Sequence, residues 1–231
     1  MKRKNIIMLI INSLIITSVF ILNYFYQSNG FSFKLKIICS GLFATLGIIN
    51  LIYAILTKTK NVRFYISMSI ALILACLGDY FINKDFIAGA GLFALGHIGF
   101  IIAYCFTQKI KLLDCLISFV VFLGSLMFLL FCPLLTFNVE LFRIVCIIYA
   151  LIISTMLGKA FGNFIRKKNY VNLTIAIASL MFFLSDLMLV LAWFIKGIPW
   201  ADNVCMGLYY PALCFLALSM FLQILLTKDN S

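Results

Sequence analysis

Long apolar runs are the feature that most restricts how this chain can fold. Hydrophobic residues make up 65% of the 231 residues and charged residues only 11%, whereas an ordinary soluble domain carries about 25% charged residues. A helix that crosses a bilayer needs about 20 mainly apolar residues. We therefore predict an all-α polytopic membrane protein with eight transmembrane helices, at residues 5–25, 36–56, 64–82, 86–106, 114–135, 140–160, 171–195 and 204–226.

The segments between these runs are short, which predicts one eight-helix bundle over residues 1–231. The chain begins with the basic sequence "MKRKN", but the apolar run that follows is about 21 residues long and no small-residue cleavage site succeeds it. We interpret this run as an uncleaved first span and not as a signal peptide. The clearest polar linker is "GNFIRKKNY", at residues 162–170.

The net charge of +11 would suit a nucleic-acid partner, but its distribution indicates a different cause. With the N-terminus inside the cell, thirteen of the eighteen Lys and Arg residues fall in cytoplasmic segments. Such an excess is the positive-inside bias that orients membrane proteins. We predict a multi-pass protein of the cell membrane with both termini in the cytoplasm, and we expect no nucleic-acid partner.

Two of the predicted spans resemble each other. "IALILACLGDYFI" from Ile70 and "IASLMFFLSDLML" from Ile177 align without gaps, and four of the thirteen positions match. Both spans enter the membrane from the same side, and each carries an aspartate toward its outer end. One hypothesis is a duplicated four-helix half, with the axis along the membrane normal.

Three ionisable residues lie within the predicted spans, namely Asp79, His97 and Asp186. A charged side chain at the centre of a span costs about 2.5–3.5 kcal/mol, so such residues usually face the bundle interior and serve a function. For Asp79, nearest the outer surface, the alternative is a carboxylate in contact with water near Lys84. For His97, which has Gly91, Ala94, Gly96 and Gly99 around it, the alternative is a packed histidine hydrogen-bonded between close helices.

The last span begins with "GLYYPALCFLALS". Pro211 lacks an N–H group and frees a backbone carbonyl one turn earlier. Tyr209 and Tyr210 point in different directions on a helix, so one of them can face inward and supply a hydroxyl, while the other serves as an interface anchor.

Metal ligands are scarce in this sequence. It has one histidine and eight cysteines, and no Cys-x-x-Cys pair occurs. We interpret the cysteines as small apolar packing residues. We expect neither a metal site nor a cofactor.

Four short motifs, in this order, carry a resemblance to a known family. They are "LGD" at 77–79, Gly-x-Phe-x-x-x-His at 91–97, "LSD" at 184–186 and "YYPA" at 209–212. In this order and spacing the chain resembles the YhhN-like lysoplasmalogenases, which are eight-span bundles. The resemblance implies an enzyme that hydrolyses the vinyl-ether bond of lysoplasmalogens, with a lysophospholipid substrate drawn from the membrane.

This sequence departs from the family pattern at three positions. The family often has Lys-Pro at the outer start of its second span, where Lys34 is followed here by Leu35. A tyrosine three residues after the histidine is replaced by Phe100, and a polar residue after the "YYPA" phrase is replaced by Leu213.

Vinyl-ether hydrolysis suits paired carboxyl groups, because an acid must protonate carbon and a negative charge must stabilise the oxocarbenium ion, as in glycosidases. We expect Asp79 and Asp186 to converge as an acid/base pair, with His97 beside a carboxylate and with either aspartate as the acid.

Lys34 either receives the substrate phosphate or extends to the headgroups as an interfacial lysine. The resemblance places Ser185, Tyr209 and Tyr210 in the substrate site. The alternative function is a small-molecule or proton-coupled transporter.

Overall fold

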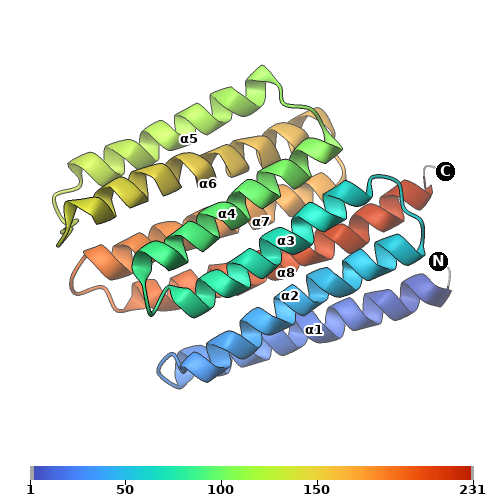
Figure 1. Cartoon of the computed structure of the whole chain (residues 1–231), viewed down its shortest axis with the longest axis horizontal. Helices are drawn as coiled ribbons and strands as arrows, with labels where there is room; N and C mark the ends of the chain where they lie inside the picture. Colours follow the sequence, from blue (N-terminus) through green and yellow to red (C-terminus); the bar gives the residue numbers. More distant parts are fainter. Residues whose placement is uncertain (1–2, 230–231) are drawn as a thin grey trace.

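Residues 3–229 are described by a computed structural model that contains eight α-helices and, between these residues, no strand (Figure 1). All eight helices are long and apolar enough to cross a membrane, which confirms the predicted fold class. The helices are α1 (Arg3–Ser28), α2 (Phe33–Leu56), α3 (Val62–Phe81), α4 (Phe86–Thr107), α5 (Leu112–Phe131), α6 (Glu140–Arg166), α7 (Tyr170–Phe194) and α8 (Trp200–Asp229).

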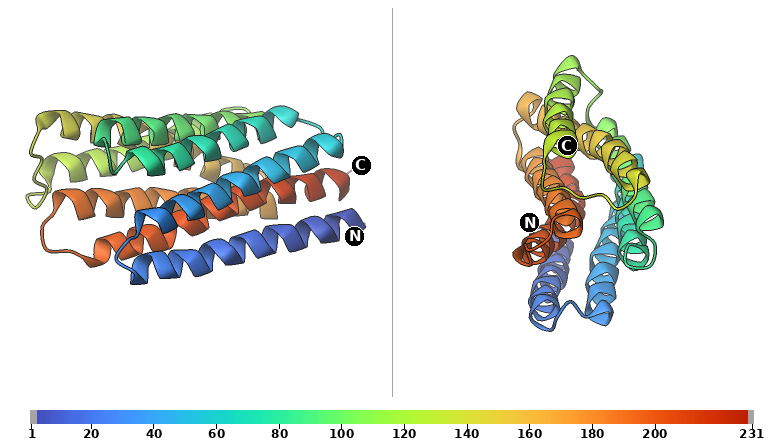
Figure 2. Two further views of the ribbon diagram at one scale, coloured as in Figure 1. Left: turned by 60° about the horizontal axis from the view of Figure 1, so that its bottom comes forward. Right: turned by 90° about the vertical axis from the view of Figure 1, so that its left-hand side faces the viewer.

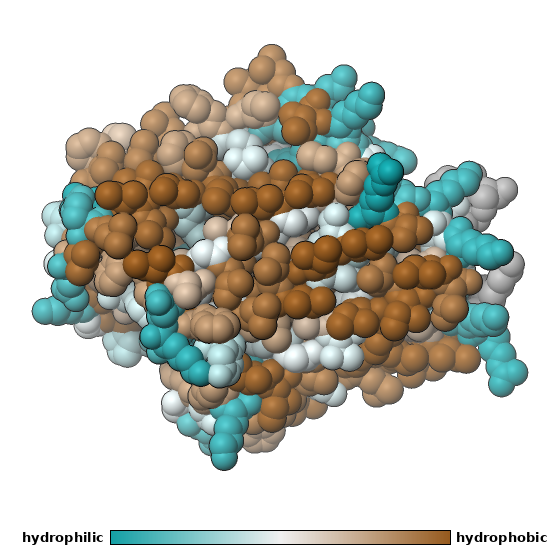
Figure 3. All heavy atoms as spheres, viewed as in Figure 1, coloured by the Kyte–Doolittle hydropathy of each residue, from teal (hydrophilic) through white to brown (hydrophobic). Residues whose placement is uncertain are grey.

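Successive helices run in opposite directions, so α1 begins and α8 ends at the same end of the bundle (Figure 1). The connections 29–32, 82–85, 132–139 and 195–199 lie at the opposite end, which we call the distal end. On the face drawn in Figure 3, apolar side chains cover the middle of the bundle and hydrophilic ones gather toward its two ends. This distribution matches a hydrocarbon layer bounded by two polar interfaces.

The predicted polar linker at 162–170 is mostly wrong, because α6 continues to Arg166 and only residues 167–169 connect it to α7. The polar side chains of this last part are used inside the bundle. Asn163 donates to the carbonyl oxygen of Tyr104 over 3.1 Å, and Arg166 pairs with Asp114. Partners in neighbouring helices therefore allow a polar sequence to remain helical.

A buried ionic cluster fixes α5 against α6 near the end of the bundle at which α1 begins and α8 ends. Lys159 Nζ lies 3.0 Å from Asp114 Oδ2, and Arg166 binds the same carboxylate. The two helices approach closely at Gly158 and Gly162, where an added Cβ would collide with Ser118 or Asp114. Small residues at a helix contact bring backbones together in lipid, and here they also bring the charges together.

Small residues also set the distance between α3 and α4. A Cβ on Gly96 would lie 3.2 Å from the carbonyl oxygen of Ala71, and a Cβ on Gly99 would lie 3.0 Å from the Ala71 Cβ. The close approach expected around His97 is therefore present. Gly91 does not contribute to it, since nothing lies within 4 Å of a Cβ built there.

Asparagines attach α1 to the rest of the bundle. Asn12 and Asn50 exchange two side-chain hydrogen bonds of 3.1 and 2.9 Å, and Asn50 also donates to the carbonyl oxygen of Ala217 over 2.9 Å. Near the distal end, Asn23 donates to the carbonyl oxygen of Met206. Polar side chains that bond across helices in this way hold transmembrane helices together.

The pairs of packed helices repeat with an offset of four helices along the chain. The α1–α2, α2–α3 and α3–α4 contacts have counterparts in α5–α6, α6–α7 and α7–α8, and the α2–α8 contact has one in α4–α6. The α1–α2 and α5–α6 pairs form opposite edges of the bundle (Figure 2). This arrangement agrees with the hypothesis of two four-helix halves, although the α1–α8 and α3–α8 contacts have no counterparts.

Candidate active site

Asp79 lies at the centre of a buried polar cluster between α2, α3 and α8. Its exposed fraction is 2%. Ser40 Oγ and the Tyr209 hydroxyl donate to its Oδ2 over 2.5 and 2.8 Å, and Lys36 Nζ lies 3.6 Å from Oδ1. The cluster therefore gives this carboxyl group both hydrogen-bond donors and a compensating positive charge.

The alternative interpretation of Asp79, a carboxylate in contact with water near Lys84, is wrong. Asp79 is enclosed, and Lys84 Nζ instead donates to the Tyr80 hydroxyl over 2.5 Å. The lysine that reaches Asp79 is Lys36. Lys34, two residues earlier, is exposed at the beginning of α2.

Asp186 belongs to a second cluster, which α4, α6 and α7 build. The Tyr149 hydroxyl donates to Asp186 Oδ2 over 2.7 Å. His97 Nε2 lies 2.7 Å from the same hydroxyl and 3.3 Å from Asp186 Oδ2. The other ring nitrogen, Nδ1, lies 3.3 Å from Met156 Sδ. His97 is completely buried, whereas the Asp186 side chain keeps an exposed fraction of 13%.

The two carboxyl groups, which we expected to converge as an acid/base pair, lie in two separate hydrogen-bonded clusters. Each has its own hydrogen-bond partners, and no hydrogen bond or ion pair among residues 3–229 joins one to the other. Aromatic rings connect the two clusters: the Phe182 ring lies 4.5 Å from the His97 ring and 5.4 Å from the Tyr209 ring, between ring centroids. The arrangement is two adjacent centres with a shared aromatic contact.

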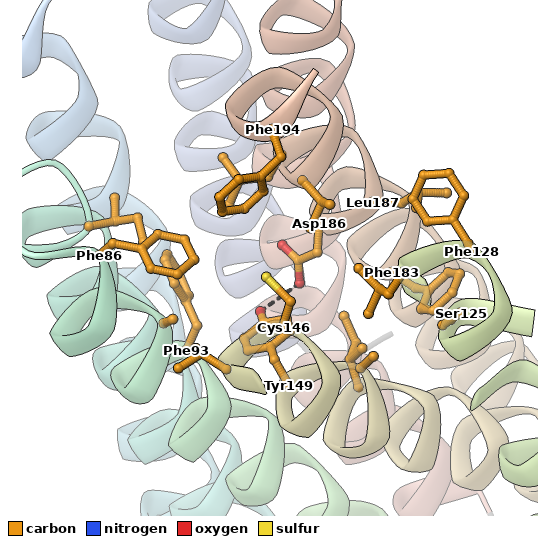
Figure 4. A pocket seen from close by; sticks show the side chains of 18 residues that line it. Phe86, Phe93, Ser125, Phe128, Cys146, Tyr149, Phe183, Asp186, Leu187 and Phe194 are labelled. Atoms are coloured by element: carbon orange, nitrogen blue, oxygen red, sulfur yellow. Dashed lines mark hydrogen bonds between the residues drawn. The ribbon is translucent and has the colours of Figure 1, made fainter. Parts of the chain in front are cut away.

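An apolar pocket of about 80 Å³ opens beside the second cluster. Its walls come mainly from α4, α5, α6 and α7, and Phe86, Phe93 and Phe194 contribute rings to them. The Asp186 carboxyl group points into this space and is joined there to Tyr149 (Figure 4). Asp79 does not line the pocket. The pocket therefore sets one carboxyl group among apolar walls.

A second, more polar pocket of about 450 Å³ lies at the distal end. Thr136 and Asn138 line it from the α5–α6 connection. Lys196 lines it from the α7–α8 connection, and Asp202 lines it from the first turn of α8. Phe194 lines both pockets. A polar space at the membrane surface therefore adjoins the apolar space that contains the Asp186 carboxyl group.

Two of the residues expected in the substrate site face other parts of the protein. Ser185 Oγ donates to the carbonyl oxygen of Phe182 over 2.8 Å within its own helix. The Tyr210 hydroxyl donates to the carbonyl oxygen of Lys36 over 3.3 Å. Of the two adjacent tyrosines, Tyr209 supplies its hydroxyl to Asp79.

Sequence reasoning missed four residues of the two clusters, namely Lys36, Ser40, Tyr149 and Met156. A signal existed for three of them. Lys36 and Ser40 are four residues apart and so lie on one face of a helix, and Tyr149 is a lone hydroxyl within the apolar run "CIIYALII". Met156 carries no comparable signal, because methionine is common in apolar spans.

Comparison with family models gives a match to the YhhN family over residues 39–220. The chain belongs to the YhhN family. This is the lysoplasmalogenase family, and the chain is thus a membrane protein of that family. The matched segment contains Asp79, His97, Tyr149, Asp186 and Tyr209 and excludes both lysines of α2. Neither the curated proteins nor the solved structures gave a match.

Proposed function

We propose that this YhhN protein hydrolyses the vinyl-ether bond of lysoplasmalogens to a fatty aldehyde and a glycerophospho-headgroup. The observation that carries the proposal is the Asp186 carboxyl group, which points into an apolar pocket and is held by Tyr149 and His97. A pocket of this kind accepts an alkenyl chain and presents a single acid to it.

The reaction needs a positioned acid more than it needs a nucleophile. A proton adds to the vinyl carbon distal to oxygen, and the oxygen lone pair forms an oxocarbenium ion. Water attacks this ion, and the resulting hemiacetal collapses to aldehyde and alcohol. In the proposal, Asp186 gives the proton, its carboxylate then stabilises the cation, and the attacking water returns a proton to it, as in glycosidases.

The proposal assigns Asp79 a different task. Because Asp79 does not line the apolar pocket, it acts through Tyr209, whose hydroxyl it binds. The Tyr209 ring packs against Phe93, at 6.0 Å between centroids, and Phe93 is part of the pocket wall. Lys36, Asp79 and Tyr209 thus fix one wall of the pocket and serve as positioning residues.

The substrate headgroup fits the polar pocket at the distal end. Eight residues separate Asp186 from Phe194, which is about 12 Å along a helix and comparable to the extent of a glycerophospho-headgroup. Lys196 is therefore better placed for the phosphate than Lys34, which begins a helix that does not line either pocket.

Purified protein in detergent tests the proposal, with vinyl-ether and ester lysolipids of the same headgroup compared as substrates. We expect aldehyde from the vinyl ether without any ion gradient, and at least a 10²-fold lower turnover in Asp186→Asn, as for loss of a positioned acid. With rapid trapping of the aldehyde, heavy water should place one deuterium on the carbon next to it.

Labelled oxygen from water should enter the aldehyde. Labelled oxygen in the glycerol hydroxyl, or the absence of aldehyde with active ester cleavage, would overturn the proposal. Activity that appears only in sealed vesicles with a gradient would support a transporter instead.

A further inference from the structure

The hydrogen-bond pattern around His97 restricts where its protons lie. A thioether sulfur has no hydrogen to donate and accepts weakly, so the contact between Nδ1 and Met156 Sδ at 3.3 Å is satisfied when Nδ1 carries the proton. The state of Nε2 then depends on the Tyr149 hydroxyl, 2.7 Å away. Tyr149 has one hydrogen and two neighbours that can receive it, namely His97 Nε2 and Asp186 Oδ2.

Two proton arrangements satisfy the same positions of the heavy atoms. In the first, an imidazolium donates from Nε2 to the Tyr149 oxygen, and Tyr149 donates to an ionised Asp186. In the second, a neutral Asp186 carboxylic acid donates to the Tyr149 oxygen, and Tyr149 donates to Nε2. The two differ by the movement of two protons in the same direction, and the net charge of the three groups is zero in both.

We propose that Tyr149 is a proton relay that joins His97 to Asp186 and exchanges the carboxylate form of Asp186 for its carboxylic acid form. The relay deepens the proposed function and rests on it for its role in turnover. The surroundings favour the neutral arrangement, because His97 is fully buried and packed against Phe182, and separated charges are costly in such a place. In the neutral arrangement, the group that faces the pocket is a carboxylic acid.

The relay also serves the step after protonation. When the Asp186 O–H bond breaks and the new C–H bond forms, a carboxylate remains beside the oxocarbenium ion. The Tyr149 hydroxyl then turns from His97 to Asp186 and donates to that carboxylate. Attack by water forms the C–O bond and releases one proton, which Asp186 accepts, and the chain of hydrogen bonds returns to its first state. No proton is gained or lost over the cycle.

Tyr149→Phe tests the relay, because it keeps the ring and removes only the hydroxyl. We expect kcat to fall about 10²-fold with KM changed less than about threefold. The matched control is Tyr104→Phe, which removes another buried hydroxyl, bonded to Ser179 at 3.0 Å, and should leave both constants near those of the unaltered protein.

A second readout needs no substrate and so separates failure of the relay from failure of the proposed function. The infrared carbonyl stretch of a protonated carboxyl group, assigned to Asp186 by its loss in Asp186→Asn, should be present in the unaltered protein. In Tyr149→Phe, where the carboxyl group loses the hydroxyl and is left in direct contact with His97, this band should shift in frequency. A band that is unchanged in Tyr149→Phe would overturn the relay, whatever the activity.

A fluorinated tyrosine at position 149 keeps the relay testable if the phenylalanine variant does not fold. It preserves the hydroxyl and nearly the same shape, and it makes the hydroxyl a stronger donor. We expect it to shift the Asp186 carbonyl band and to change kcat more than KM. Unchanged spectra and kinetics in a folded fluorotyrosine protein would contradict the relay.

Discussion

Replacement of Lys36 by methionine should destabilise the protein strongly, because it leaves the Asp79 carboxyl group buried without its positive partner. Lys36 Nζ lies 3.6 Å from Asp79 Oδ1, and the two side chains are only 5% and 3% exposed. At that distance and an effective dielectric constant of 20, two unit charges attract by about 4–5 kcal/mol. Removal of one member of a buried pair typically costs about 3–5 kcal/mol.

The companion variants separate this ionic effect from simple loss of packing. Asp79→Asn should cost a similar amount, since it leaves the lysine charge buried. The double variant Lys36→Met/Asp79→Asn removes both charges, and its asparagine can still accept from Ser40 and Tyr209. We expect it to be no less stable than either single variant, which corresponds to a coupling free energy of about 3 kcal/mol.

Reversible unfolding by sodium dodecyl sulfate in mixed micelles, followed by circular dichroism, measures these differences. Lys34→Met is the matched control, because Lys34 is exposed two residues earlier on the same helix, and it should shift stability by less than about 0.5 kcal/mol. A Lys36→Met protein as stable as the control, or additive losses in the double variant, would refute the buried pair as a source of stability.

Three further predictions follow from the charges and the two pockets. Lys196→Gln should raise KM for a lysophospholipid several-fold with kcat little changed, whereas Lys34→Gln should alter neither constant. The reverse result would identify Lys34 as the residue that binds the phosphate. Exhaustive chelation in metal-free buffer should leave turnover intact, because no three His, Cys, Asp or Glu side chains gather into a metal site between residues 3 and 229; loss restored by one divalent ion would contradict this. Reporter fusions after the C-terminus and within 167–169 should both report cytoplasm, from the basic asymmetry, and an external signal from either would reverse the orientation.

The fold was predictable from sequence because lipid admits few structures. A segment in hydrocarbon must satisfy its own backbone hydrogen bonds, so eight apolar runs of sufficient length become eight helices. The ends of the helices were less predictable. The polar residues Asn163 and Arg166 of α6 are typical of a loop when only the sequence is considered. Their partners, Tyr104 and Asp114, come from α4 and α5.

The candidate site was predictable only in part, for a related reason. Asp79, His97 and Asp186 stand out because ionisable groups are rare in apolar spans. Their partners give weaker signals, because a lysine near a helix end is also typical of the membrane interface and a tyrosine is also typical of an aromatic belt. Which aspartate faces the pocket depends on the rotation of α3 and α7 about their axes, and packing against neighbouring helices sets that rotation.

The two carboxyl centres are equivalent in their construction and different in their chemistry. Asp79 on α3 is bound from α2 and α8, and Asp186 on α7 is bound from α6 and α4, so an offset of four helices converts one set of helices into the other. This equivalence supports two related halves independently of the weak sequence match around the aspartates. The first centre carries a lysine, and its carboxylate is enclosed and compensated. The second carries a histidine and a tyrosine and opens to an apolar pocket. A duplicated frame would thus supply two carboxyl sites, of which one is enclosed beside a lysine and the other lines an apolar pocket.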